Sequence, residues 1–140
     1  MTVPHYDTLG DLRRAFATIV APFDVHAGYK EFATSPTDNG GPHVEQTGPT
    51  YAFVVTERGR ELERRETADP DDILYWLVAE VTRQVASKHE LHNRRPGVDS
   101  RRMWFDHDVQ LLSAIRREWG MRKRAEYDHV LEQHPFHDEA

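Results

Sequence analysis

Apolar residues recur with a helical period near the start of the chain. They fall at every third or fourth position, which places them on one face of a helix: Leu9, Leu12, Phe16, Ile19 and Val20. Thr8 is a residue type that caps helix N-termini, and Asp11 follows three residues later as a weak partner in a capping box. Pro22 cannot continue a helix. The pattern therefore predicts a first helix over residues 8–21.

The periodic pattern stops between residues 23 and 49, where turn-forming residues gather. This segment holds four glycines and three prolines. It predicts an irregular loop region with short strands around Tyr29–Phe32 and His43–Gln46. A loop of this length in a small domain is typically functional or mobile.

A strand-like composition begins at Tyr51. Residues 51–57 are rich in β-branched and aromatic side chains, Arg58-Gly59 supplies a turn, and residues 60–67 form the return strand of a hairpin. The return strand is charged at almost every position except Leu62, and its charges alternate in sign. Such a strand is typical of a solvent-facing edge protected against aggregation, and a role in recognition stays open beside that interpretation.

Two further helical segments follow the hairpin. Asp69 at the N-cap, Pro70 at the first helical position and Asp72 in the first turn begin a strongly apolar helix. Apolar residues line nearly two of its faces, so we expect this helix to be buried and Trp76 to lie in the core. Asp99 caps a third helix, and Gly120 is the expected bend before a more polar continuation to about residue 134.

These elements predict an α+β fold in which a small antiparallel sheet, the hairpin at about 51–67, packs against three or four helices. A chain of 140 residues suits a single domain, 1–140. Its parts are the helix at 8–21, the loop region at 23–49 and a core over 50–136.

Composition and charge narrow the classes of function. The chain has no cysteine, which suits the reducing cytoplasm. Its net charge of −6 argues against a nucleic-acid partner, because phosphate binding needs a concentrated positive face. It has neither a secretory signal pattern nor a run of about 18 apolar residues, so we expect a soluble protein without a membrane partner. The acidic excess would favour encounter with a basic protein.

Catalytic motifs are weak. His89-Glu90-Leu91-His92 approaches the zinc-protease helix motif, but that motif needs its histidines one full turn apart. The histidines and Asp138 of the tail, at 134–138, lie in a terminus that we expect to be frayed. No serine lies in a nucleophile elbow, and no glycine-rich segment joins a strand to a helix as a phosphate cradle does. We therefore expect no enzymatic activity, no metal and no cofactor.

Arg101 and Arg102 conflict with the helix dipole, because they place two cations in the first turn of the third helix. The conflict indicates that a carboxylate elsewhere forms ion pairs with these arginines. Glu80 or Glu90 in the preceding helix are the internal candidates, and an acidic group on a partner is the alternative.

Three segments resemble a known family. They are Tyr51-Ala-Phe-Val-Val-Thr-Glu-Arg-Gly-Arg-Glu-Leu-Glu-Arg-Arg, then Asp72-Ile-Leu-Tyr-Trp-Leu, then Asp99-Ser-Arg-Arg-Met-Trp-Phe with Gln110-Leu-Leu and Trp119. Together, over roughly residues 43–136, they resemble the Immunity protein 63 family of bacterial polymorphic toxin systems. The resemblance implies a cytoplasmic, non-enzymatic α+β protein that binds and blocks a toxin encoded beside it.

Binding to a toxin calls for aromatic and arginine anchors on a rigid surface. The anchor candidates are Trp76, Trp104, Tyr75 and the hairpin at Arg58–Arg65. Trp76 fits the core better, and Trp104, off the main apolar stripe, is the better surface candidate. The expected partner-binding residues are Arg58, Arg60, Glu61, Glu63, Arg64, Asp99, Arg101, Arg102 and Trp104. Two alternatives remain: a small hydrolase or metal-dependent enzyme using His89, His92 and nearby carboxylates, and a general protein-interaction scaffold.

Overall fold

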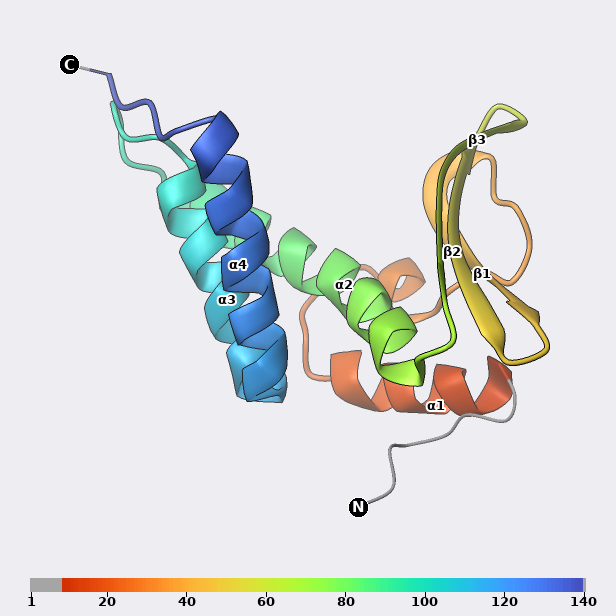
Figure 1. Ribbon diagram of the computed structural model, residues 1–140. Coiled ribbons are helices and arrows are strands. Elements are labelled where there is room, and N and C mark those ends of the chain that lie inside the picture. Colours follow the sequence, from red (N-terminus) through yellow and green to blue (C-terminus); the bar gives the residue numbers. More distant parts are fainter. Residues whose placement is uncertain (1–8, 140) are drawn as a thin grey trace. The chain divides into compact units, whose positions relative to one another are not determined.

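The computed structural model describes residues 9–139 (Figure 1). Their order is helix α1 (Leu9–Val20), the 3-10 helix η1 (Ala27–Lys30), strands β1 (Asn39–Thr47), β2 (Thr50–Glu57) and β3 (Arg60–Thr67), and helices α2 (Pro70–His92), α3 (Arg101–Ile115) and α4 (Arg117–Gln133). The chain divides after Val78 into two compact units, so α2 begins in the first and ends in the second. The predicted α+β class is confirmed.

The first unit contains one antiparallel sheet with the order β1-β2-β3. β2 is central and almost wholly buried, because its β-branched and aromatic side chains face packed neighbours on both sides. β3 is an edge strand and is mostly exposed, as its charges predicted. α2 lies against the sheet, where the ring of Trp76 meets that of Phe53 edge-on at 6.4 Å.

The loop region between residues 23 and 49 is more regular than its composition predicts. The short strand expected around His43–Gln46 is confirmed and is longer, spanning β1. The strand expected around Tyr29–Phe32 is wrong, because residues 27–30 form η1, whose first turn is held by a hydrogen bond from Gly28 N–H to His26 Nδ1 (3.0 Å). Pairing with β2 supplies the order in β1 that local propensity does not, and it buries Val44 opposite Phe53.

The helices α1 and α2 lie where the sequence predicts them. The expected stripe of α1 is buried at Leu12, Phe16 and Val20, whereas the proposed cap Thr8 lies outside the described residues. At α2, the Asp69 carboxylate accepts the backbone N–H of Asp71 (2.9 Å), as an N-cap should.

Among residues 9–139 no helix is both long and apolar enough to cross a membrane.

The turn between α3 and α4 lies at Arg116 and not at Gly120, where the sequence predicted it. Arg116 is extended (φ −148°, ψ 128°), and Gly120 continues within α4. An added Cβ on Gly120 would lie 1.7 Å from Ser113 Oγ. Gly120 therefore serves the close approach of the two helices instead of bending the chain.

Candidate functional site

The candidate residues of the hairpin surround an ion-pair network on β3. Arg64 contacts Glu61 (Nη2 to Oε1, 2.8 Å) and Glu45 on β1 (Nη1 to Oε1, 3.3 Å). The hydrogen bond that Arg64 donates to Glu61, and then the one that it donates to Glu45, raises the pKa of Arg64. His43 Nε2 lies 2.8 Å from Glu45 Oε2, and this contact, followed by that of Arg64, lowers the pKa of Glu45. Arg64 is therefore committed to partners within the sheet.

Arg65 belongs to the same strand and ends the hairpin segment indicated by the sequence, although it is not among the expected partner-binding residues. Its guanidinium carbon lies 4.4 Å from the ring centre of Phe53 and 4.9 Å from that of Trp76. Its Nε forms an ion pair with Glu63 Oε1 at 3.1 Å. The hairpin register, which pairs Phe53 with Arg65, is the signal that could have found it. Trp76 is half-buried beneath this arginine and is less enclosed than predicted.

Arg58 and Arg60 flank the turn between β2 and β3, and both are exposed. Within the described part of the chain, neither side chain has a hydrogen bond or ion pair. The turn itself is held by Asp38, whose carboxylate accepts the N–H of Gly59 (3.2 Å) and whose carbonyl accepts that of Arg58 (3.3 Å). This end of the hairpin therefore presents two unengaged cations on a fixed backbone.

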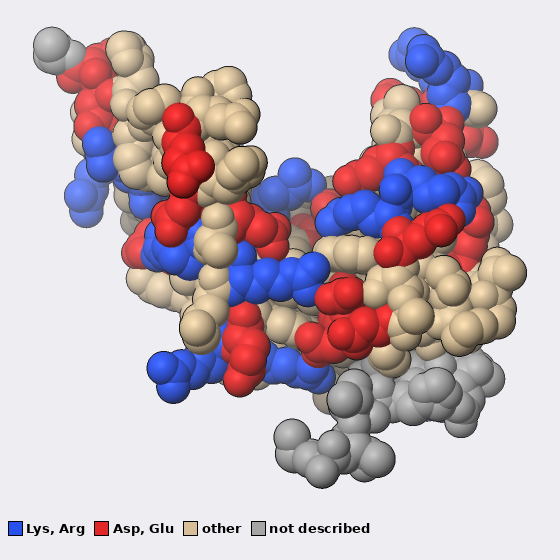
Figure 2. All heavy atoms as spheres, in the orientation of Figure 1, with Lys and Arg blue, Asp and Glu red and all other residues tan. Residues whose placement is uncertain are grey.

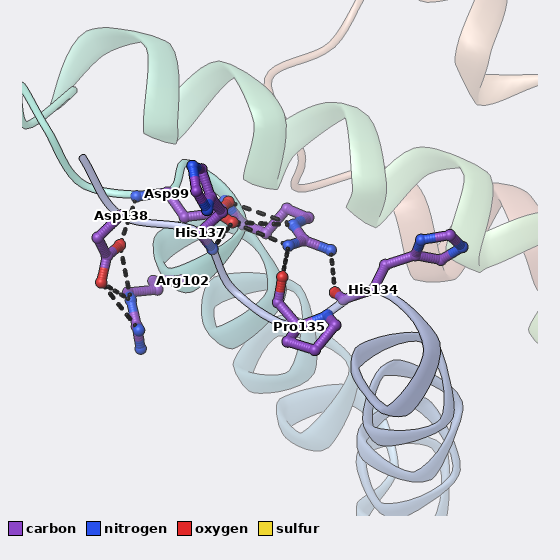
Figure 3. Close-up of polar contacts among 7 residues, drawn as sticks. Asp99, Arg102, His134, Pro135, His137 and Asp138 are labelled. Atoms are coloured by element: carbon purple, nitrogen blue, oxygen red, sulfur yellow. Dashed lines mark hydrogen bonds and ion pairs between the residues drawn. The ribbon is translucent and has the colours of Figure 1, made fainter.

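The other candidate set lies at the start of α3, in the second unit, and centres on Asp99 (Figure 3). Its carboxylate accepts hydrogen bonds from the Arg101 side chain (2.8 Å), the Arg101 N–H (3.0 Å) and the His137 N–H (2.9 Å). These contacts, the Arg101 side chain first, hold the pKa of Asp99 well below its ordinary value. Asp99 thus supports the start of the helix as predicted, although Ser100 occupies the N-cap position.

The side chains of Arg101 and Arg102 bind groups of the C-terminal tail. Arg101 donates to the carbonyl oxygens of His134 and Pro135, each at 2.8 Å. Arg102 Nη2 lies 2.9 Å from Asp138 Oδ2, and this contact lowers the pKa of Asp138. Asp138 also accepts the N–H of Asp99 (2.8 Å). These contacts show an internal structural role for both arginines.

Two predictions about this region are therefore wrong. Glu80 and Glu90 do not pair with Arg101 and Arg102. Glu80 forms an ion pair with Arg83 of α2 (2.9 Å), and Glu90 forms one with Arg94, which follows the end of α2 (2.8 Å). The tail is not frayed, since residues 134–139 are tied to residues 97–102, including a backbone hydrogen bond from Glu139 N–H to the Gly97 carbonyl (2.9 Å). Asp99, two residues before Arg101, and Asp138, 36 residues after Arg102, take the place of the two glutamates of α2.

Trp104 and Tyr75 are less available than predicted. Trp104 is half-buried, and its ring meets those of Phe105 (4.5 Å) and Tyr127 (5.7 Å) edge-on. These rings form a core cluster with Val109, and the Tyr127 hydroxyl donates to the buried carboxylate of Asp108. Tyr75 is 1% exposed and cannot act as a surface anchor.

Comparison with known protein families gives a match to the family described as Immunity protein 63, over residues 47–129. The chain belongs to the Immunity protein 63 family. The match begins at the last residue of β1 and runs through β2, β3, α2, α3 and most of α4. Comparisons with curated proteins and with solved structures found no match.

His89, which the sequence offered as a possible metal ligand, contacts the ring of another histidine. Its ring stacks on that of His107 in α3, with ring centres 4.1 Å apart and planes 8° from parallel. Burial, and then the neighbouring His89, lowers the pKa of His107. Among residues 9–139, no group of three or more His, Asp or Glu side chains is placed to hold a metal ion.

Proposed function

We propose that this chain is an immunity protein that binds and neutralises a cognate bacterial toxin encoded nearby, and so protects the producing cell. The observation that carries the proposal is membership of the Immunity protein 63 family, whose match includes both the hairpin and the start of α3. Neutralisation by occlusion needs a binding surface and no catalytic group. We accordingly propose a non-enzymatic protein that acts in the cytoplasm, where the toxin would be made.

The distribution of charge supports a basic toxin. The acidic excess of the chain falls within residues 1–78, whereas residues 79–140 hold equal numbers of acidic and basic residues. A partner that approached the first unit would therefore meet a negative field, which favours basic surfaces and speeds their encounter. The charged residues of the hairpin and the opening of α2 belong to this unit.

Co-expression with the product of the adjacent gene tests the proposal. The expected result is that the chain restores growth to cells poisoned by that gene product and co-purifies with it in a fixed ratio. Growth arrest that continues despite full expression of the chain, together with no co-purification, would contradict the proposal. No observation favours the hydrolase alternative, and gene context separates a toxin partner from the partner of a general scaffold.

A further inference from the structure

The turn between β2 and β3 holds an arginine in a backbone conformation that arginine rarely adopts. Arg58 has φ 51° and Gly59 has φ 76°, and the flanking residues Glu57 and Arg60 pair directly. Positive φ at both central residues defines a type I′ turn, in which Asn, Asp or Gly is strongly preferred at the first position. Arginine at this position is strained, which suggests that the side chain has a use.

The backbone of this turn is fixed from outside the hairpin. Asp38, in the segment before β1, accepts the N–H groups of both central residues, at 3.3 Å through its carbonyl and at 3.2 Å through its carboxylate. The N–H of Asp38 in turn donates to Thr56 Oγ1 (3.3 Å), so Asp38 is itself held by β2. Because this backbone is already fixed, binding need not order the turn, and only the freedom of the side chains themselves is lost.

The side chains at this point are available for contact. The side chains of Arg58 and Arg60 have no polar partner among residues 9–139, whereas the side chain of Arg64 contacts two glutamates. Leu62 is the unpaired residue of a β-bulge and is 55% exposed. Bulges commonly redirect side chains near functional sites. Figure 2 shows basic side chains projecting at the β2–β3 turn.

We infer that Arg58, Arg60 and Leu62, here called the hairpin tip, form the anchor that enters a carboxylate-lined recess of the toxin. The inference rests on the proposed function. Guanidinium groups recognise carboxylates through paired hydrogen bonds, and Leu62 adds an apolar contact beside them. A recess that presents at least two carboxylates and an apolar wall is the chemistry that this tip fits.

A nucleic acid is a poorer fit for the same arginines. Glu57, Glu61 and Glu63 surround the hairpin tip, and all three are exposed. A polyphosphate backbone running past the tip would be repelled by these carboxylates, and its binding depends on many cations acting together. A pocket that admits only the tip avoids this repulsion.

Binding of the purified, catalytically inactivated product of the adjacent gene tests the inference. Arg58→Asn relieves the backbone strain while it removes the charge, so the thermal midpoint should rise as affinity falls. The double variant Arg58→Asn/Arg60→Asn should weaken binding by about 10- to 100-fold. Arg95→Asn is the control, because Arg95 is exposed and has no ion pair among the described residues.

The outcomes separate the inference from the proposed function. If the wild-type chain does not bind the gene product, the proposed function fails and the inference falls with it. If the wild type binds and the double variant stays within twofold of it, the proposed function stands and the hairpin tip is not the anchor. Wild-type binding to a 20-nucleotide single-stranded RNA, abolished in the double variant, would likewise overturn the assignment to a carboxylate recess.

Discussion

Gly120 shows how a single residue is selected by packing against a neighbouring helix. In the interior of α4 a glycine costs about 1 kcal/mol relative to alanine, so helix propensity alone favours its replacement. The structure reverses this preference, because Ser113 of α3 approaches the position that a Cβ would occupy. From sequence, this glycine was interpreted as a bend, since a glycine needed for a close helix contact has the same local signature as one that ends a helix.

The Gly120→Ala variant should therefore be less stable than the wild type, by roughly 1–3 kcal/mol, as for other overpacked interior sites. Chemical denaturation followed by circular dichroism measures the difference. Ser113→Ala is a suitable control, because it removes the Oγ atom without adding volume, and it should change stability little. A Gly120→Ala variant that is more stable than the wild type would contradict the close approach of α3 and α4.

At the scale of elements, the start of α3 and the C-terminal tail form one structure, which is called the tail latch and consists of residues 97–102 and 134–139. The sequence indicated that Arg101 and Arg102 needed carboxylates, and this expectation is confirmed. Its internal candidates, Glu80 and Glu90 of the preceding helix, were the wrong carboxylates, because the sequence does not show that the tail returns to the start of α3. Asp138 follows Arg102 by 36 residues and reaches it only because α4 returns antiparallel to α3.

The tail latch should make stability depend on acid pH. The pKa values of Asp99 and Asp138 are lower in the folded chain than in the unfolded chain, mainly through Arg101 and Arg102 respectively. Stabilisation by such groups is fully present above their unfolded pKa, near 4, and is lost as pH falls below it, because the unfolded chain then binds more protons.

Asp99→Asn should consequently be less stable than the wild type at pH 7, and the difference should shrink toward pH 2. Thermal unfolding at several pH values measures this convergence. Asp128→Asn, at an exposed position of α4 without an ion pair among the described residues, should follow the wild type throughout. A constant difference between Asp99→Asn and the wild type from pH 7 to pH 2 would show that the Asp99 charge is not what supports the tail latch.

At the scale of the whole molecule, the distribution of charge along the chain follows directly from the sequence. The acidic excess lies within residues 1–78, and the surface of this unit includes both signs of charge along β3. A basic toxin would thus be attracted by the unit as a whole, while the hairpin tip would make a local contact with carboxylates. The organisation of residues 1–140 as a single domain stays a prediction from chain length.

Association with the proposed toxin should accordingly slow as salt is added. Electrostatic steering raises association rates about 10-fold or more at low ionic strength, and this gain is screened by salt. Stopped-flow or biosensor measurements at 50 and 500 mM NaCl would measure the effect on the association rate. An association rate unaffected by salt would argue against a basic partner, although it would leave neutralisation itself untouched.

The sequence by itself determined the α+β class, the helix α1, the start of α2, the exposed edge strand β3 and the resemblance to the family that the comparison confirms. These features depend on short-range periodicity, on caps or on residue identity. Only the tertiary structure decided the length and pairing of β1, the role of Gly120, the partners of Arg101 and Arg102 and the stacking of Arg65 on Trp76. Each of these depends on which groups the folded chain brings together, and local spacing carries no information about which of them meet.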